Sequence, residues 1–288
     1  MNEPMTMEIH SHSTTSDGKF SPSGLAELMS DAGVDLWALT DHDSIEGCDA
    51  AREAATELGL GFVPGIEVSA ELQGESIHVL GYGVDTADRD LSSYGVEMTE
   101  ARLDRMARMV DRMCELGVEV TLEDVIEVSG GGNLGRPHLA KALQKRGHVA
   151  STDKAFDRWL GTSRPGYVPM LRPPVVEAIK MIRDAGGMAV LAHPGRYSDV
   201  SEHFERWHNA GLWGLEVRHP SHNRRSEERL IRLADRNSLG KTASNDWHGH
   251  KPGDPDRLGR VVFPVSWQRS FFEALSETAE GLDGALRR

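Results

Sequence analysis

Two histidines separated by a single residue stand near the start of the chain, and an aspartate and a histidine with the same spacing stand near its end. His10 and His12 follow a short apolar run, with Asp17 five residues further on, while Asp246 and His248 follow another apolar run. Side chains two positions apart on a strand point to the same side, so each pair aims at one point. Imidazoles and carboxylates that converge from opposite ends of a chain suit a cluster of divalent metal ions.

The length and the charge of the chain limit the folds and the functions that it can have. Its 288 residues fit a single α/β barrel, a fold that reaches this length as one domain. Hydrophobic residues make up 39% and charged residues 27%, as in ordinary globular proteins. The 32 basic and 45 acidic residues give a net charge of −13, whereas a protein that coats long nucleic acids is basic. A chain this acidic that handles phosphates must concentrate positive charge locally, in metal ions and a few arginines.

The cysteines and the first residues bear on the compartment. Cys48 and Cys114 are the only cysteines, so we expect neither a disulfide framework nor a thiolate metal site. Met1–Thr6 is too short and too polar for a signal peptide. The sequence has no run of roughly 18 apolar residues, the length that predicts a transmembrane helix. We therefore expect a cytoplasmic protein that does not enter a membrane.

Strands and helices alternate over most of the chain. Ser21 and Pro22 open a helix that ends at Gly33, and Ser44 caps another that ends before Gly59. Seven segments are typical of strands: Met7–His10, Asp35–Thr40, Phe62–Ser69, Ile77–Val84 after a turn at Gln73-Gly74, Met188–Ala192, Gly214–Val217 and Lys241–Ser244. Later helices are expected over Val175–Ala185, Val200–Ala210, Ser226–Asn237 and Gln268–Thr278. The alternation predicts an α/β barrel, and seven strands in place of eight predict a distorted one.

The alternation stops between Leu91 and Leu160, where the pattern is helical. An apolar stripe at helical spacing is formed by Leu103, Met106, Val110 and Met113, and further helices are expected from Thr121 and over Pro137–Arg146, separated by a break at Gly130-Gly131-Gly132. We predict a helical insertion, residues 91–167, that covers the mouth of a barrel formed by residues 1–90 and 168–288. Loops at the carboxyl ends of barrel strands carry function in such folds.

Histidines and carboxylates gather at the predicted strand ends. The carboxyl ends of parallel strands meet at one face of an α/β structure. Six of the thirteen histidines and three carboxylates are therefore expected at one place: His10, His12, Asp17, His42, Glu67, His78, His193, Asp246 and His248. A single buried histidine is more often a core residue than a ligand, but this joint placement predicts a metal centre.

Five motifs, in order, resemble those of the PHP (polymerase and histidinol phosphatase) superfamily of phosphoesterases. They are His10-Ser11-His12-Ser13, Thr40-Asp41-His42-Asp43, Gly65-Ile66-Glu67-Val68-Ser69, Ala192-His193-Pro194-Gly195 and Asp246-Trp247-His248. The resemblance covers Glu8 to His250 and implies a distorted (β/α)7, TIM-like barrel that holds two or three divalent ions. It implies Mn first, with Fe or Zn as alternatives, because ligands without thiolates suit all three.

The resemblance also implies how the ligands are shared. One ion would take His10, His12, Glu67 and Asp246, a second would take Asp17, His42 and His248, and a third would take Glu67, His78 and His193. Asp41 and Asp43 must point away from His42 if the strand continues through them, so they are left out. Paired metal ions generate a hydroxide near neutral pH and stabilise the oxygens of a phosphate ester. No side chain is then needed as the catalytic base or nucleophile.

Asp17 separates this chain from the histidinol phosphatases of the superfamily, which usually have a histidine at that position. Ser16-Asp17-Gly18, Gly135-Arg136-Pro137-His138 and Ser221-His222-Asn223 resemble the nucleoside 3′,5′-bisphosphate phosphatases and the related 5′-to-3′ exoribonucleases. The implied activity is removal of the 3′-phosphate from a nucleotide such as 3′-phosphoadenosine 5′-phosphate (pAp), or of nucleotides from the 5′ end of short RNA. Arg136, His138, Arg196 and His222 are the candidate substrate-binding residues, because a guanidinium can bind a phosphate through two hydrogen bonds.

Three other functions stay open from the sequence. One is a histidinol-phosphatase-like or other small phosphomonoesterase. A second is a non-catalytic module of a DNA polymerase, against which the length of 288 residues and the complete set of nine candidate ligands argue. The third is a metal-dependent amidohydrolase, where a bridging lysine would be usual and Glu67 stands here instead. The expected partners are a small nucleotide or a short oligonucleotide; the sequence does not predict the oligomeric state.

Overall fold

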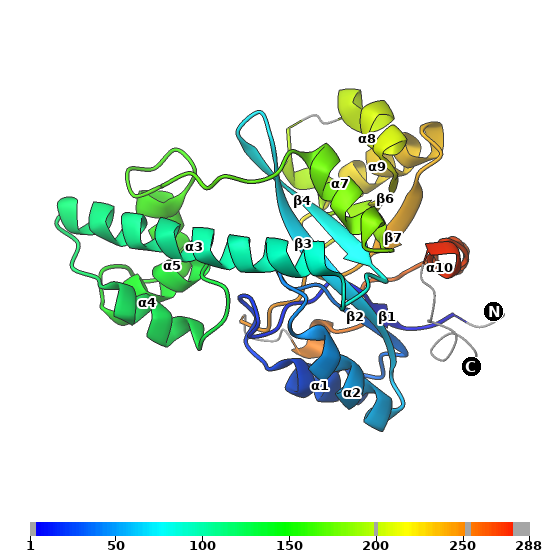
Figure 1. Cartoon of the computed structure of the whole chain (residues 1–288), viewed down its shortest axis with the longest axis horizontal. Helices are drawn as coiled ribbons and strands as arrows, with labels where there is room; N and C mark the ends of the chain where they lie inside the picture. Colours follow the sequence, from blue (N-terminus) through cyan, green and yellow to red (C-terminus); the bar gives the residue numbers. More distant parts are fainter. Residues whose placement is uncertain (1–3, 199–200, 251–254, 279–288) are drawn as a thin grey trace.

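A curled sheet of seven strands forms the centre of the computed structural model, which describes residues 4–198, 201–250 and 255–278 (Figure 1). The strands lie in sequence order, and neighbours are parallel except that β4 runs against both β3 and β5. The seven predicted strands are confirmed, although their ends differ. They are β1 (Met7–Glu8), β2 (Leu36–Leu39), β3 (Gly61–Leu72), β4 (Glu75–Tyr82), β5 (Met188–Leu191), β6 (Leu212–Arg218) and β7 (Gly240–Ala243).

The backbone segments that follow the first and last strands meet and close the sheet. Ser11 and Trp247 form an isolated parallel bridge. The N–H of His12 donates to Trp247 O at 2.8 Å, and the N–H of Trp247 donates to His10 O at 3.0 Å. The segments after β1 and β7 are therefore joined beside the candidate ligands. The distorted seven-stranded α/β barrel predicted from the sequence is confirmed.

The direction of β4 was not predicted from the sequence, although the turn that reverses the chain was. Gln73 and Gly74 connect β3 to β4, with φ angles of 52° and 84°, so the predicted turn is confirmed. A two-residue turn can join only antiparallel strands, whereas parallel strands need a longer crossover. His78 on β4 consequently lies beside Ser69 on β3, at the edge where the parallel strands end.

The helices around the sheet mostly follow the capping signals. Ser21 Oγ accepts the N–H of Gly24 at 3.1 Å at the start of α1. α2 begins later than predicted because Ser44 Oγ accepts the N–H of Glu46 in a turn and does not cap the helix. The helix predicted from Val200, which lies outside the described residues, begins at Phe204. These helices are α1 (Pro22–Asp31), α2 (Cys48–Leu58), α7 (Val175–Asp184), α8 (Phe204–Ala210), α9 (Arg224–Arg236) and α10 (Val265–Thr278), with short 3-10 turns η2 (Pro194–Arg196), η3 (Ser201–His203) and η4 (Pro255–Arg257).

Between β4 and α7 the chain is helical, as predicted, and α3, α4 and α5 extend to one side of the sheet (Figure 1). Met106, Met113 and Leu139 belong to a buried cluster that is separate from the clusters around the sheet. Leu103 is 45% exposed, so its place in the apolar stripe was predicted wrongly; Arg102 and Arg105 occupy the buried face there. The division into a barrel and an insertion (91–167) stays a prediction, which this separate cluster supports. The segment contains α3 (Arg89–Glu115), α4 (Leu122–Ser129), α5 (Arg136–Lys145), α6 (Thr152–Ala155) and the π-helical turn η1 (Phe156–Leu160).

The described helices do not meet the requirements of a membrane span. None of them combines sufficient length with sufficient apolar character to cross a membrane. The longest, α3, has 27 residues, but Arg102 and Arg105 lie on its buried face.

Candidate metal centre and adjoining cavity

The nine candidate ligands lie close together beside the carboxyl ends of the parallel strands. His10 and His12 follow β1, Glu67 lies within β3, and His42 pairs with Glu67 in an isolated parallel bridge beyond the end of β2. Three groups of side chains each offer ligand atoms that all lie within 4.8 Å of one another. The structure therefore brings residues from distant parts of the chain into one cluster.

The first group contains the four residues proposed for the first ion: His10, His12, Glu67 and Asp246. Nε2 of His10 lies 3.3 Å from Glu67 Oε2 and 3.3 Å from Asp246 Oδ1. Nε2 of His12 lies 3.2 Å from the same two oxygens. Two imidazole nitrogens and two carboxylate oxygens thus face a common point.

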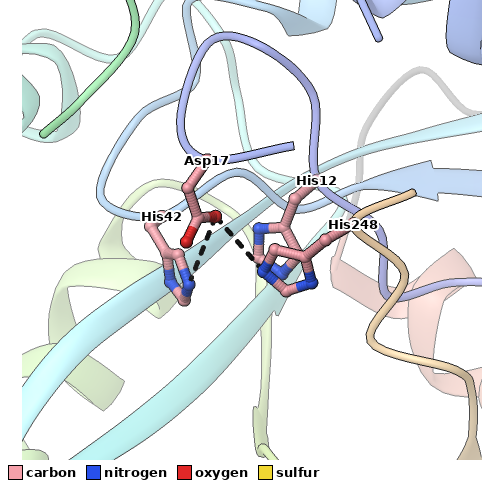
Figure 2. Close-up of side chains that lie close together, drawn as sticks. All are labelled: His12, Asp17, His42 and His248. Carbon is pink, nitrogen blue, oxygen red and sulfur yellow. Dashed lines mark ion pairs between the residues drawn. The ribbon is translucent and has the colours of Figure 1, made fainter. Parts of the chain in front are cut away.

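The second group contains His12, Asp17, His42 and His248, and Figure 2 shows the four side chains pointing toward one another. Asp17 Oδ1 lies 3.2 Å from His248 Nε2 and 3.8 Å from His42 Nε2. The group includes the three residues that the resemblance assigns to a second ion, and it adds His12. His12 therefore lies between the two groups.

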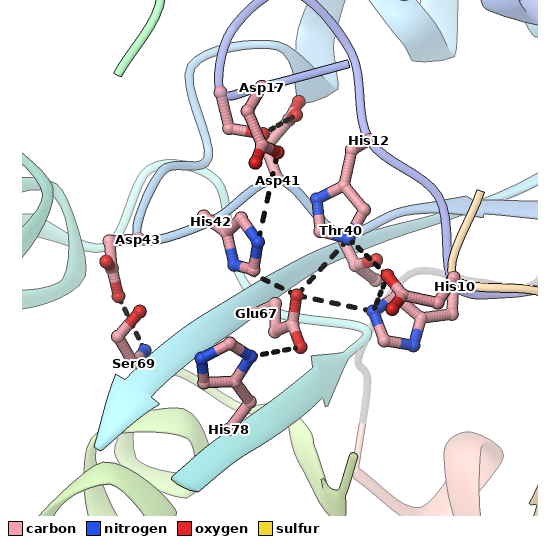
Figure 3. Close-up of polar contacts among 12 residues, drawn as sticks. His10, His12, Asp17, Thr40, Asp41, His42, Asp43, Glu67, Ser69 and His78 are labelled. Carbon is pink, nitrogen blue, oxygen red and sulfur yellow. Dashed lines mark hydrogen bonds and ion pairs between the residues drawn. The ribbon is translucent and has the colours of Figure 1, made fainter. Parts of the chain in front are cut away.

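The third group differs from the set implied by the resemblance in one member. It contains His42, Glu67 and His78, whereas the implied set has His193 in place of His42. His78 Nδ1 lies 2.9 Å and His193 Nε2 lies 3.1 Å from the same oxygen, Glu67 Oε1. His42 Nδ1 lies 3.0 Å from the other oxygen. Glu67 is thus the carboxylate around which the histidines collect (Figure 3).

Buried side-chain atoms without hydrogen bonds show that these residues fit metal ions. A buried polar atom without a partner costs free energy, so such atoms are rare. Cations held among these side chains would take the carboxylate oxygens and one nitrogen of each imidazole as ligands. Seven of these atoms belong to the candidate ligands: His10 Nε2, His12 Nδ1 and Nε2, Asp17 Oδ1, His42 Nδ1, Glu67 Oε2 and Asp246 Oδ1. The donor set of nitrogen and oxygen without sulfur suits divalent ions such as Mn, Fe or Zn.

The charges of these side chains are strongly coupled. Burial alone would raise the pKa of Glu67, but His42, His10 and His78 hold it well below its usual range. Burial would likewise raise the pKa of Asp17, and His248 and His42 hold it well below its usual range. Both carboxylates are therefore ionised at neutral pH. Burial alone would lower the pKa values of His10 and His42, but the carboxylates beside them raise both. Ions that bind here must therefore displace protons from these rings, because a ligating imidazole is neutral.

Glu216 and His219, on and just after β6, contact the candidate ligands and were not predicted from the sequence. Glu216 is fully buried, and its Oε1 lies 3.0 Å from His10 Nδ1. Its Oε2 accepts the backbone N–H of His193 at 2.8 Å. His219 Nε2 lies 3.4 Å from Asp246 Oδ2. Glu216 could have been noticed in the sequence because it is the only carboxylate in Gly214–Val217, an apolar segment predicted to be a strand.

Asp41 supports the loop that carries Asp17. Its Oδ1 accepts the backbone N–H of Ser13 at 2.7 Å and the hydroxyl of Ser16 at 2.6 Å, and its Oδ2 accepts the hydroxyl of Ser13 at 2.6 Å. Figure 3 shows Asp41 beside Asp17. Its oxygens are thus occupied by protein donors, in agreement with its exclusion from the expected ligands.

A cavity of about 570 Å³ adjoins the cluster and is rich in arginine. Arg136 is held there, because its Nη1 donates to Leu160 O at 3.2 Å and its guanidinium lies over the ring of Tyr167. Arg196 lies 3.6 Å from Asp246 Oδ2. The cavity is lined by Gln73, Gly74, Glu75, Ser76, His78, Arg136, Thr162, Tyr167, Arg172, His193, Arg196 and Tyr197. Two of the candidate ligands thus form part of a wall that also presents three guanidinium groups.

Arg105 adds buried positive charge beside the cavity. The residue is 3% exposed, and its Nη2 has no hydrogen-bond partner. Burial, together with Arg136 and Arg172, lowers the pKa of Arg105 to about 9, so the guanidinium is still charged at neutral pH. Crowded cations without a carboxylate partner are favourable surroundings for an anion.

Of the four candidate substrate-binding residues, Arg136 and Arg196 line this cavity, and His138 and His222 do not. His138 is buried, and its Nδ1 accepts the N–H of Gly135 at 3.1 Å at the start of α5. His222 accepts the N–H of Gly195 with Nε2 at 3.0 Å, and its Nδ1 donates to Val217 O at 2.8 Å. Both ring nitrogens of His222 are used in this way, so His222 positions the loop that carries Arg196.

Sequence comparisons relate the chain to a known family and to known enzymes. The family model described as "PHP domain" matches residues 8–160. The chain is 32% identical to a 3′,5′-nucleoside bisphosphate phosphatase of Chromobacterium violaceum, over 87% of this chain and 89% of that protein. It is 30% identical to the 5′-3′ exoribonuclease Rnm of Salmonella typhimurium, over 91% of each.

A further relative and a solved structure extend the comparison. The chain is 33% identical to a phosphoribosyl 1,2-cyclic phosphate 1,2-diphosphodiesterase of Eggerthella lenta, over 89% of this chain and 97% of that protein. A solved structure from Bifidobacterium adolescentis, whose title describes a metal-dependent phosphoesterase, superposes with a TM-score of 0.86 and 32% identity. It covers 98% of this chain and 100% of that one. The three relatives described here are all named for reactions of phosphate esters.

Proposed function

Because the chain belongs to the PHP domain family and is a metal-dependent phosphoesterase, we propose that it removes the 3′-phosphate from nucleoside 3′,5′-bisphosphates such as pAp. One observation carries this substrate: the cavity that contains Arg136, Arg172 and Arg196 directly adjoins His78 and His193. A bisphosphate would offer one phosphate to the metal centre and the other to these guanidinium groups. The enzyme is a phosphoric ester hydrolase.

The proposed metal centre uses the nine candidate ligands and holds two or three ions, with Mn expected first. Bound ions would lower the pKa of water and stabilise the charge on the phosphoryl oxygens. Glu67 would bridge ions, since both of its oxygens face histidines. Glu216 would hold the His10 ring in place through Nδ1. No side chain is assigned as a catalytic base.

The chain's own residues would orient the substrate. Arg136 and Arg172 would bind the 5′-phosphate, because guanidinium groups form charge-assisted hydrogen bonds to phosphate oxygens. Arg196, which contacts Asp246, would lie nearest to the reacting phosphate. Tyr197, which also lines the cavity, would contact the ribose or the base. A small nucleotide is therefore the proposed partner, and the cytoplasm is the proposed compartment.

The second candidate substrate is the 5′ end of short RNA, which the match to the exoribonuclease over 91% of the chain favours. In that case the arginines would hold the terminal 5′-phosphate and the metal centre would act on the first phosphodiester bond. Amidohydrolase activity and a non-catalytic polymerase module are not favoured by the relatives.

A turnover screen tests the proposal. Purified protein loaded with Mn²⁺ is incubated with pAp, a 5′-phosphorylated short RNA, histidinol phosphate and phosphoribosyl 1,2-cyclic phosphate. We expect the highest kcat/KM with pAp, with release of phosphate and AMP as products. A higher kcat/KM with RNA would move the assignment to the second candidate. Preference for histidinol phosphate or the cyclic phosphate would contradict both.

A further inference from the structure

Asn133 contacts both loops that carry the second group of candidate ligands. Its side-chain Nδ2 donates to the backbone oxygen of His42 at 3.1 Å. Its backbone N–H donates to Thr15 O at 3.0 Å, two residues before Asp17. Asn133 is 7% exposed, and Thr99 Oγ1 of α3 lies 2.6 Å from its Oδ1. One residue of the helical segment is thus fixed between the backbones next to Asp17 and His42.

Gly132 allows this close approach. A Cβ atom at this position would lie 2.1 Å from Thr14 O and 2.6 Å from Ser16 O, both of them backbone atoms. Atoms cannot approach this closely, so any other residue would push the two loops apart. The glycine-rich break that separates α4 from α5 is therefore packed directly against the loop that carries Asp17.

Asp43, the residue after His42, is also held by residues of the helical segment. Asp43 has a φ of +53°, a region that non-glycine residues seldom adopt. Its carboxylate accepts hydrogen bonds from Arg102 and, at 2.6 Å, from the hydroxyl of Tyr94, both of which belong to α3. It also accepts the N–H of Ser69 at 2.6 Å, and Figure 3 shows Asp43 beside Ser69.

Backbone contacts connect Asp43 to the third strand as well. Its N–H donates to Glu67 O at 2.9 Å. The Arg102 side chain is 10% exposed, so its ion pair with Asp43 is screened little by solvent. Hydrogen bonds of Asp43 consequently connect the His42-Asp43 dipeptide to α3 and to the backbone of Glu67.

We infer that the helical segment completes the second metal position, with Asn133, Arg102 and Tyr94 as positioning residues for His42, and Asn133 together with Gly132 for Asp17. Asp17 lies on a loop beyond the strands. His42 lies beyond the end of β2, where an isolated bridge with Glu67 links it to the sheet on one side. The inference rests on the proposed metal centre. It assigns to residues 91–167 a part in metal binding that is separate from substrate contact by Arg136.

Metal titration of the full chain tests this inference without a substrate. Chelator-treated protein is titrated with Mn²⁺, and free Mn²⁺ is followed by electron paramagnetic resonance. Asn133→Ala should weaken one equivalent by about tenfold or more, the scale found for residues that orient metal ligands, and leave the other equivalents unchanged. Ser129→Ala is the matched control, because Ser129 is equally buried and bonds only within its own helix end.

A double-mutant cycle identifies the affected equivalent. Asp17→Asn should weaken the same equivalent, and Asn133→Ala in that background should add little, because both act on one position. Thr99→Val removes only the hydroxyl that donates to Asn133 Oδ1. It should lower the affinity of the same Mn²⁺ equivalent by a smaller factor, so the inference can still be tested if Asn133→Ala fails to fold.

The outcomes are distinct. A wild type that binds fewer than two equivalents overturns the metal centre and this inference with it. A wild type with two or more equivalents, combined with an Asn133→Ala variant that matches Ser129→Ala, overturns this inference alone. Additive losses in the cycle would also overturn it, because Asn133 and Asp17 would then act at different positions.

Discussion

Glu216 and His10 form a buried carboxylate–imidazole pair, with Glu216 Oε1 3.0 Å from His10 Nδ1. Burial would raise the pKa of Glu216, but His10 holds it below its usual value. The carboxylate is therefore ionised and must accept, so Nδ1 of His10 carries the proton. Nε2 of the ring is then turned toward Glu67 and Asp246, the orientation that a metal ligand needs.

Removing the charge of Glu216 should weaken metal binding. We expect Glu216→Gln to lower the affinity of the metal centre by about 10- to 100-fold, because a residue that orients a ligand is lost while the shape is kept. The measurement is a Mn²⁺ titration of chelator-treated protein. Glu228→Gln, which removes an exposed surface charge on α9, is the control. Equal affinities in the two variants would assign Glu216 a purely structural role.

Replacing Asp17 should reduce turnover without unfolding the protein. Asp17→Asn keeps the size of the side chain but removes the charge that faces His248 and His42. We expect kcat/KM to fall by at least about tenfold, which corresponds to about 1.4 kcal/mol of transition-state stabilisation. Activity is measured with pAp, and folding by circular dichroism. Asp49→Asn, an exposed position on α2, serves as the control. Unchanged activity would remove Asp17 from the site.

Truncating Arg136 should raise KM for a substrate with two phosphates far more than KM for a substrate with one. Arg136→Ala should raise KM for pAp by about tenfold or more and change KM for an aryl phosphate by less than about twofold, since remote binding energy exists only for the first substrate. Arg146→Ala, at the other end of α5 and paired with Asp124, is the matched control. Equal losses on both substrates would place Arg136 at the reacting phosphate, and no loss on either would exclude it from binding.

His138 should make stability depend on pH between neutrality and mild acid. Burial lowers the pKa of His138 to about 4, whereas an unfolded histidine titrates near 6.5. Between these values the unfolded chain binds a proton that the folded chain does not. The stability that His138 contributes is therefore complete above pH about 6.5 and is lost as the pH falls toward 4.

The comparison of pH 7 with pH 5 isolates this effect. With chelator present, the free energy of unfolding of wild type should fall by about 1 to 2 kcal/mol more than that of His138→Gln, which has no titrating ring but keeps an acceptor for the Gly135 N–H. Urea denaturation at the two pH values is the measurement. Equal pH dependence in both proteins would show that His138 is protonated alike in the folded and unfolded chains.

Several candidate ligands could be proposed from the sequence because they closely follow strands, as His10, His42 and His193 do. Glu67 and His78 instead lie inside β3 and β4. Local pattern gives the direction of a side chain near a strand end, as for His10 and His12, and the fold brings those ends together. Glu216 was missed because its partner His10 lies 206 residues away. Arg102 was missed because helical periodicity assigns a charged residue to the surface, whereas the contact with Asp43 buries it.

The direction of β4 illustrates a different limit. Side chains alternate between the two faces of a strand whichever way the strand runs. The residues of Glu75–Tyr82 alone therefore do not show whether β4 is parallel or antiparallel to its neighbours. Only the short connection at Gln73 and Gly74 distinguishes an antiparallel hairpin from a parallel crossover. Whether His42 or His193 would join Glu67 and His78 at a third position depends on distances between side chains, which the sequence does not give.

Changes in the hairpin that reverses β4 would alter substrate specificity without rebuilding the sheet. Gln73 and Gly74 form part of the cavity wall, yet they belong to a surface turn that connects only two strands. Residues inserted there would narrow or widen the entrance while every helix kept its register. In a barrel built entirely of parallel strands, the corresponding change would have to pass through a crossover helix. The wall of this cavity can therefore be altered at one turn while the residues beneath it stay in place.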